Sequence, residues 1–202
     1  LFSISKSNPS GTRFLGIDVS NESEIIYKAK CLINNSIYMI EQIKQFDNPD
    51  CRITLDEINI QHKLSEYADS RYGLRTSDTK RFIFFFWEVN KYNSDWEYHQ
   101  STVPVTINYS GRENLLFWQK GKGELQNYSE LGLASLQGSD AWNKRGIVVS
   151  LMGDLPITIY EGTYFDNNCA VVWPFKEEYL LPVLAYCSSP DFQLEVRKLD
   201  QA

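Results

Sequence analysis

Hydrophobic residues recur at helical spacing near both ends of the chain. In residues 22–34, the apolar positions that share one helical face are Ile25, Ile26, Ala29, Leu32 and Ile33. Near the other end, residues 180–186 and 190–199 are helical in pattern, with Ser189 as a cap and Pro190 at the first helical position. The sequence therefore predicts one helix close to the start of the chain and two at its end.

The middle of the chain has the shorter apolar runs that are typical of β-strands. Residues 82–87 form a continuous apolar run, which predicts a buried strand, and apolar residues alternate with others in residues 103–109, which predicts a half-exposed one. Residues 147–149, 157–160 and 170–173 are further strand candidates separated by turns that contain glycine. We expect these last three to form one continuous sheet.

The remaining elements complete a mixed fold. Residues 36–40 are typical of a short buried strand, residues 115–118 of another strand, and residues 54–57 have the spacing of a capping box that opens a short helix. We predict an α+β fold with a mixed, mostly antiparallel sheet and flanking helices. Its character changes near residue 64, so we expect a helical and irregular connector in residues 1–64 and a β-rich domain with C-terminal helices in residues 65–202.

Composition and charge narrow the functions that are compatible with this fold. A chain of 202 residues that is 43% hydrophobic and 14% aromatic can bury a substantial core, and aromatic side chains favour sheets. Its net charge of −6 argues against a free-standing nucleic-acid binder, because such domains are usually basic. The chain starts at Leu1 and stops inside an apparent helix, so we expect it to be part of a larger protein that supplies further contacts.

The cysteines do not have the spacing of a metal site or of a disulfide framework. The four cysteines are Cys31, Cys51, Cys169 and Cys187, without a Cys-x-x-Cys pair and with only two histidines in the chain. We therefore expect free thiols, no metal and a reducing cytoplasmic location. No apolar run approaches the roughly 20 residues that span a bilayer.

A polar segment that carries four cations, residues 65–81, leads directly into the aromatic run. We expect this segment to be a loop, since loops on a rigid scaffold commonly carry binding residues. Its candidates for contact with DNA bases or phosphates are Arg71, Arg75, Thr76, Ser77, Lys80 and Arg81. The alternative is a solvated loop in which the cations pair with Asp69 and Asp78.

Two further groups of polar residues have the composition of phosphate-binding loops. Lys120 and Lys122 alternate with glycines in a predicted flexible loop, and Asn143, Lys144 and Arg145 follow a tryptophan. A solvated turn is the alternative for both groups.

The tryptophans divide by their surroundings in the sequence. Trp87, Trp118 and Trp173 adjoin apolar runs, so we expect them in the core. Trp96 and Trp142 have polar neighbours and are the better candidates for stacking on bases.

Several segments in a consistent order carry a resemblance to a known family. Residues 72–78, Tyr-Gly-Leu-Arg-Thr-Ser-Asp, lead through Arg81-Phe82 to Trp87-Glu88, and the other matching segments are residues 16–20, 48–53, 111–114, 116–118, 141–146, 155–156, 165–168 and 187–190. This series resembles the carboxy-terminal target-recognition region of adenine-specific DNA methyltransferases in type IIG-like restriction-modification systems. Ser77 stands where that family usually has glycine.

The resemblance implies the function of a whole enzyme, of which this chain is one part. It implies recognition of double-stranded DNA here and a Rossmann-like domain upstream that binds S-adenosylmethionine and transfers the methyl group. The chain has neither the Asn-Pro-Pro-Tyr motif that holds the flipped adenine in such enzymes nor a glycine-rich cofactor loop. We therefore expect no catalytic residue and no cofactor in this fragment.

Two other classes of function are compatible with the residues. The acidic balance and numerous Tyr and Trp residues also suit a carbohydrate- or protein-binding β-domain without catalysis. A stand-alone hydrolase has little support, because the chain has only two histidines and no nucleophile motif.

Overall fold

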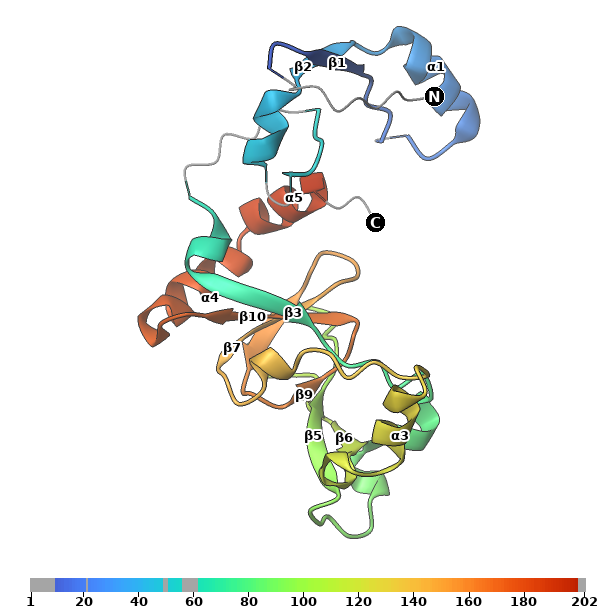
Figure 1. Ribbon diagram of the computed structural model, residues 1–202, viewed down its shortest axis with the longest axis vertical. Helices are drawn as coiled ribbons and strands as arrows, with labels where there is room; N and C mark the ends of the chain where they lie inside the picture. Colours follow the sequence, from blue (N-terminus) through green and yellow to red (C-terminus); the bar gives the residue numbers. More distant parts are fainter. Residues whose placement is uncertain (1–9, 21, 49–50, 56–61, 200–202) are drawn as a thin grey trace. The chain divides into compact units, whose positions relative to one another are not determined.

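The computed structural model describes residues 10–20, 22–48, 51–55 and 62–199. The chain divides into two compact units, one formed by Leu1–Lys63 with Arg197–Ala202 and the other by Leu64–Val196 (Figure 1). Helices accompany three sheets whose strands pair antiparallel with one exception, so the predicted α+β class is confirmed. Among the described residues, every helix is too short or too polar to span a lipid bilayer.

The described part of the first unit contains an antiparallel pair of strands, an α-helix and a 3-10 helix at Ile43–Asp47. β1 (Arg13–Gly16) pairs antiparallel with β2 (Tyr38–Glu41), and α1 (Ile25–Asn34) lies between them in sequence. The predicted helix is confirmed, but none of its residues is buried. The strand predicted at 36–40 is confirmed as β2, but its predicted burial is wrong, since Ile40 alone is buried there. The predicted helix at 54–57 extends into residues that lie outside the described part.

A four-stranded antiparallel sheet forms the main core of the second unit. Its order is β3 (Ala68–Tyr72), β10 (Cys169–Pro174), β7 (Gly146–Ser150) and β8 (Ile157–Tyr160). The three apolar runs that predicted one continuous sheet are its last three strands. The edge strand β3 corrects the prediction of a loop at 65–81, because β10 supplies hydrogen-bond partners for a polar segment with little strand propensity of its own.

Alternate residues of these strands fill two separate hydrophobic clusters. On one face, Ile147, Val149 and Val172 pack with α4 (Leu180–Cys187) and α5 (Pro190–Leu199), which are red in Figure 1. Both helices confirm the sequence prediction, and the Ser189 hydroxyl accepts the Phe192 N–H at 3.3 Å as a cap. On the other face, the buried side chains are Ala141, Val148, Tyr160, Phe165, Cys169, Val171 and Trp173.

The predicted strand at 103–109 is wrong, because this segment runs beside β8 without forming a regular ladder. Ile107 N–H donates to the Ile157 carbonyl at 3.1 Å, and Ile159 N–H donates to the Asn108 carbonyl at 3.0 Å. Pro104 has no N–H to donate, and Val103 N–H bonds instead to the Ser150 hydroxyl at 2.8 Å. The segment therefore covers the sheet edge through a mixture of backbone and side-chain contacts.

The second unit also contains a smaller sheet with the order β4 (Ile83–Phe85), β6 (Asn114–Phe117), β5 (Trp96–Gln100) and β9 (Tyr164–Phe165). Only the β5 and β9 pair is parallel. Two short helices, α2 (Thr79–Phe82) and α3 (Glu124–Glu130), accompany it. Buried side chains from these elements and their loops form the third cluster: Leu74, Phe82, Leu116, Leu125 and Ala134.

The expectation of one continuous buried strand at residues 82–87 is also wrong. Phe82 ends α2 and is fully buried, whereas the strand itself has only three residues. The chain then enters a 3-10 turn at Phe86–Glu88, where Phe86 is 57% and Trp87 61% exposed. The Glu88 carboxylate accepts the Phe85 N–H at 2.8 Å, which stabilises this turn.

Candidate nucleic-acid interface

The structure separates Arg71 from the other candidates of the predicted loop. Arg71 lies on β3, and its guanidinium pairs with the carboxylates of Asp69 at 2.8 Å and Asp140 at 3.2 Å. The same group lies 5.9 Å from the centre of the Trp173 ring. The alternative of an ion pair with Asp69 therefore holds in the free protein.

Two further candidate cations, Lys144 and Arg145, also lie near Trp173. Lys144 Nζ is 4.6 Å from the centre of the Trp173 ring, and Arg145 pairs with Glu177 at 3.5 Å and with Glu161 at 3.9 Å. Lys144, Arg145 and Trp173 also line an open cavity of about 420 Å³. We call Arg71, Lys144 and Arg145 the Trp173 cations. Acidic partners compensate both arginines of this group.

Asn143 holds the turn that precedes these residues. Its backbone has a φ of 63°, in the left-handed region that Asn tolerates better than most residues. Its N–H donates to the Gly162 carbonyl at 2.8 Å, and a Cβ on Gly162 would approach the Asn143 Cα to 2.8 Å. The position of Asn143 therefore has a structural reason that is independent of DNA.

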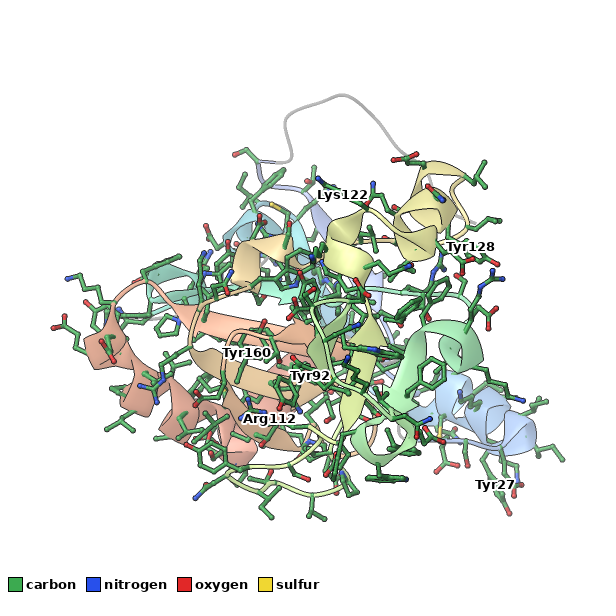
Figure 2. All side chains as sticks on the ribbon, turned by 90° about the horizontal axis from the view of Figure 1, so that it is seen from below. Tyr27, Tyr92, Arg112, Lys122, Tyr128 and Tyr160 are labelled. Atoms are coloured by element: carbon green, nitrogen blue, oxygen red, sulfur yellow. The ribbon has the colours of Figure 1, made fainter. Side chains whose placement is uncertain are left out.

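Four other candidate cations lie on segments that are linked to α3 or to the loop after it. Lys120 and Lys122 precede this helix directly, and Lys122 and Tyr128 both project from this part of the chain (Figure 2). Lys80 is next to Arg81 on α2. The guanidinium of Arg81 pairs with Glu124 in the first turn of α3. The backbone of Arg75 is bonded to the segment after α3, because the Arg75 N–H donates to the Ser135 carbonyl. We call Arg75, Lys80, Lys120 and Lys122 the α3 cations.

The α3 cations differ from the Trp173 cations in their electrostatic surroundings. In the described part of the chain, none of the four has an acidic side chain within ion-pair distance. All four residues are exposed. Uncompensated, solvent-exposed cations are the groups that can neutralise phosphates and release their counterions.

Arg81 is the bridge that fixes α2 to α3. Its Nε is 2.9 Å from the Glu124 carboxylate, and one terminal nitrogen donates to the Tyr128 hydroxyl at 2.9 Å. The hydrogen bond and charge of Arg81 lower the pKa of Glu124, and Glu124 raises the pKa of Arg81 in turn. Arg81 therefore positions the elements that carry the α3 cations.

The lysine loop contains a short 3-10 turn where the sequence predicted irregular structure. Gln119–Gly121 forms a 3-10 turn, in which Gln119 and Lys120 have φ of 51° and 58°. The Gln119 side-chain oxygen accepts the Glu124 N–H at 3.1 Å and so caps α3. A Cβ on Gly123 would meet that oxygen at 2.0 Å. The two lysines consequently project from a hydrogen-bonded turn that leads into α3.

Thr76 and Ser77 occupy a turn rather than an open binding loop. Thr76 is only 6% exposed, so its side chain belongs to the packed interior and is not on the surface of the free protein. Ser77 is exposed and has a φ of 59°, the conformation that glycine adopts most easily. The backbone therefore needs a positive φ at the position where the resembling family has glycine.

Other residues of the resembling segments also have structural roles. A Cβ on Gly73 would lie 2.2 Å from the Phe165 carbonyl oxygen, so only glycine fits there without a shift of backbone. The Asp166 carboxylate accepts the Asn168 N–H at 2.7 Å. The buried Asn48 side chain donates to the Arg52 carbonyl at 2.7 Å. These residues specify turns and close approaches of the backbone within their own units.

The tryptophans only partly follow the sequence predictions. Trp173 is buried and Trp118 half-buried, but the prediction of a core position for Trp87 is wrong, since it stacks on Phe85 at 4.5 Å on the surface. Of the two stacking candidates, Trp142 packs against Tyr164 and has a buried Nε1 without a partner in the described part of the chain. Trp96 lines a second cavity.

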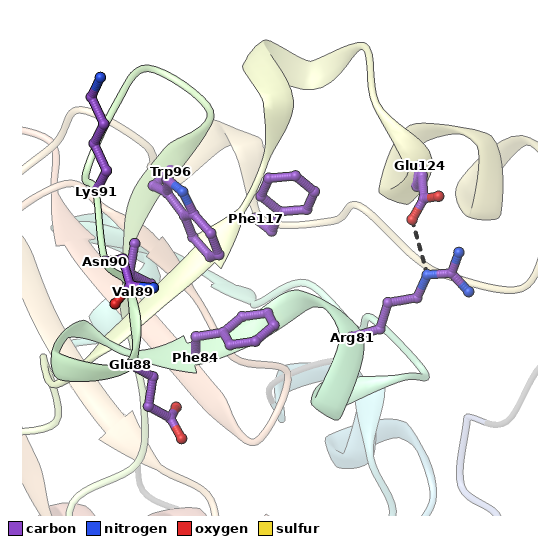
Figure 3. A pocket seen from close by; sticks show the side chains of 9 residues that line it. All are labelled: Arg81, Phe84, Glu88, Val89, Asn90, Lys91, Trp96, Phe117 and Glu124. Atoms are coloured by element: carbon purple, nitrogen blue, oxygen red, sulfur yellow. Dashed lines mark hydrogen bonds and ion pairs between the residues drawn. The ribbon is translucent and has the colours of Figure 1, made fainter.

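This second cavity, of about 390 Å³, was not predicted from the sequence. Its aromatic lining comes from Phe84, Trp96 and Phe117, and the Arg81 and Glu124 pair lines it as well (Figure 3). The three rings come from three strands, so no local sequence pattern indicates that they meet. Aromatic residues in strands that pair were the only available signal.

The thiols and the acidic residues do not form a second chemical site within the described ranges. No group of three or more His, Cys, Asp and Glu side chains there has the arrangement of a metal site. Burial raises the pKa of both Cys169 and Cys187 to about 12, so these thiols remain protonated and unreactive at neutral pH. No protein-family model matches the chain, and no curated protein matches it either.

Proposed function

We propose that this chain is the DNA-sequence recognition part of a site-specific adenine DNA methyltransferase of a restriction-modification or phage-defence system. In this proposal the chain positions duplex DNA, and an upstream catalytic domain flips the target base and transfers the methyl group from S-adenosylmethionine. The observation that carries the proposal is the group of four α3 cations, which have no acidic partner among the described residues. They lie in the unit that contains the Tyr72-Gly73 to Trp87-Glu88 pattern. Affinity for duplex DNA arises largely from such phosphate contacts.

The acidic balance of the chain is compatible with this proposal. Acidic side chains at Asp69, Asp140 and Glu124 pair with arginines that fix strands and helices in place. Because salt screens charges beyond about 10 Å at 0.1 M, a phosphate responds to the local group of cations more than to acids farther away. The nearby Glu124 carboxylate is paired with Arg81. A net charge of −6 therefore permits a local cationic surface.

We infer that the first unit contacts the catalytic domain of the same protein. The support is the exposed apolar residues of α1, where Ile25 is 86%, Ile26 69% and Ile33 84% exposed. A set of exposed isoleucines on one helix is unusual on a free surface and is typical of a protein interface. This assignment agrees with the connector role that the resemblance implies for residues 1–64.

The first test is the salt dependence of binding to duplex DNA. We expect log Kd to change linearly with log salt concentration, and loss of one phosphate contact in Arg75→Ala or Lys80→Ala to lower the slope by about 1. Lys28→Ala is the matched control, because it removes an exposed cation from α1 in the other unit. Equal slopes for the variants and the control would contradict the assignment of the α3 cations.

Sequence recognition needs a separate measurement. Selection from a pool of random duplexes by the parent protein with a cofactor analogue is expected to enrich one short motif, and Arg75→Ala is expected to weaken that enrichment. Binding that is salt-insensitive, together with no enriched motif, would refute DNA recognition. That result would favour the carbohydrate- or protein-binding alternative, for which the aromatic cavity beside Trp96 is the supporting observation.

A further inference from the structure

The cavity beside Trp96 lies on one face of the smaller sheet. Trp96 on β5 is directly opposite Phe117 on β6, and Phe84 on β4 is opposite Leu115, two residues before Phe117. Residues that pair directly in an antiparallel sheet share a face, as do residues two apart along a strand. The sheet register alone therefore brings these three aromatic rings together.

The rings form walls around an open space. Trp96 contacts the Phe84 ring at a centroid distance of 5.3 Å and an angle of 89°, and it contacts the Phe117 ring at 4.8 Å and 47°. Figure 3 shows Phe84 and Phe117 on opposite sides of the cavity, with Trp96 at one end and the Arg81 and Glu124 pair at the other. A flat group in this cavity would contact aromatic rings that come from three strands.

The polar residues of the cavity can form hydrogen bonds with the edge of a flat ring and can pair with a negative charge attached to it. The Arg81 to Glu124 ion pair, 2.9 Å long, places hydrogen-bond donors beside a carboxylate acceptor. Lys91 also lines the cavity and has no ion-pair partner in the described ranges. An arginine beside a carboxylate matches the edge of guanine, which combines acceptor and donor atoms.

We propose that this cavity holds one unstacked base of DNA. Phe84, Trp96 and Phe117 provide the stacking surface, the Arg81 and Glu124 pair contacts the base edge, and Lys91 contacts the adjoining phosphate. This inference rests on the proposed function, which it extends from phosphate contacts to a base outside the helix. A cavity of about 390 Å³ is within the range of ordinary ligand sites.

A base fits the lining better than a sugar does. A sugar packs on one open aromatic face and needs many hydrogen-bond partners for its hydroxyl groups, whereas here the rings stand at steep angles around the space. The free ammonium of Lys91 also has a natural partner in a phosphate and none in a neutral sugar. Stacking of a base on aromatic side chains does not depend strongly on sequence.

The test compares two duplexes of the same sequence, one fully paired and one with a single unpaired guanine. Fluorescence anisotropy of labelled duplexes is expected to show about tenfold tighter binding of the bulged one, a typical effect of stacking one base. Phe84→Leu and Phe117→Leu keep apolar packing but remove the ring, so each is expected to abolish this preference. In both variants the paired duplex should lose less affinity than the bulged duplex.

The control variant is Phe85→Leu, which removes an exposed ring from the same strand but outside the cavity. It should retain the tenfold preference. Equal affinity of the wild-type chain for the two duplexes would overturn the inference and leave the proposed function standing, whereas no binding of either duplex would overturn both. Binding of cellohexaose that is lost in the Phe84 and Phe117 variants would overturn the assignment to a base.

Discussion

Acidification should destabilise the second unit through one buried histidine. His99 lies on β5 between Asn114 of β6 and Tyr164 of β9, and it is 2% exposed. Neither of its ring nitrogens has a hydrogen-bond partner within the described residues. Burial lowers the pKa of His99 from 6.5 to about 4, although the charge of Asp166 acts in the opposite direction. The imidazole is therefore neutral in the folded protein at neutral pH.

The size of the effect follows from the two pKa values. Because the folded-state pKa is below the unfolded one, the unfolded chain binds more protons between them, and stability falls as pH decreases through this window. The gap between 6.5 and about 4 corresponds to roughly 3 kcal/mol in total, at about 1.4 kcal/mol per unit of pKa. Between pH 7 and pH 5, the expected loss is about 2 kcal/mol.

Urea unfolding at pH 7 and pH 5, followed by tryptophan fluorescence, measures the loss of stability of the second compact unit. All five tryptophans lie within Leu64–Val196, so their emission reports on the second unit. His99→Leu removes the titrating group and should reduce the pH dependence by about 2 kcal/mol relative to the wild type. Glu97 acts in the opposite direction, because burial raises its pKa, and so the difference between wild type and variant isolates the histidine. The same pH dependence in both proteins would refute the reasoning.

Two backbone predictions can use the same unfolding assay. Ser77→Gly should raise the free energy of unfolding by about 0.5–1 kcal/mol, because glycine removes the strain of a φ of 59°. The control is Ser70→Gly, which should lower the free energy of unfolding because Ser70 lies in a strand. Gly73→Ala should cost at least about 3 kcal/mol, because its Cβ would meet the Phe165 carbonyl at 2.2 Å. At Gly153, with a φ of 65°, an added Cβ would meet open space, so Gly153→Ala should cost only about 1 kcal/mol. Similar losses of stability in the two alanine variants would contradict the steric argument.

The core of the second unit was predictable because local patterns specify it. Residues 147–149, 157–160 and 170–173 are apolar runs of strand length bounded by turns, and each is a strand of one sheet in the structure. The C-terminal helices were equally clear, since Ser189 and Pro190 mark a helix start by their own chemistry. In these segments, local preference and tertiary packing agree.

Elsewhere, tertiary contacts override the local pattern. β3 is an edge strand with the polar sequence Ala-Asp-Ser-Arg-Tyr, and only its pairing with β10 makes it a strand. In contrast, residues 103–109 have the alternation of a strand, but proline and side-chain hydrogen bonds interrupt the ladder beside β8. A single sequence does not contain the identity of the neighbouring strand, so neither result was available in advance.

The candidate site shows the same division. The cationic residue types were evident from the sequence, but the strand at Arg71 and the helix at Arg81 separate them into two groups. Only Trp96 of the aromatic cavity was selected as a stacking candidate, because the register that brings Phe84 and Phe117 to it joins residues more than 10 positions apart. Long-range register is the information that the sequence pattern lacked.

The cations of the second unit have two different roles, and this difference limits what net charge can predict. Some cations form ion pairs with acidic side chains and so connect separate elements of the fold, namely Arg71, Arg81 and Arg145. Lys80 and Lys122 are exposed without such partners in the described part of the chain. Replacement of the paired arginines should therefore disturb the local structure, whereas replacement of the lysines should change only the interaction with a polyanion. A sum over all charges combines these two populations, so a chain of net charge −6 can still present cations to phosphate.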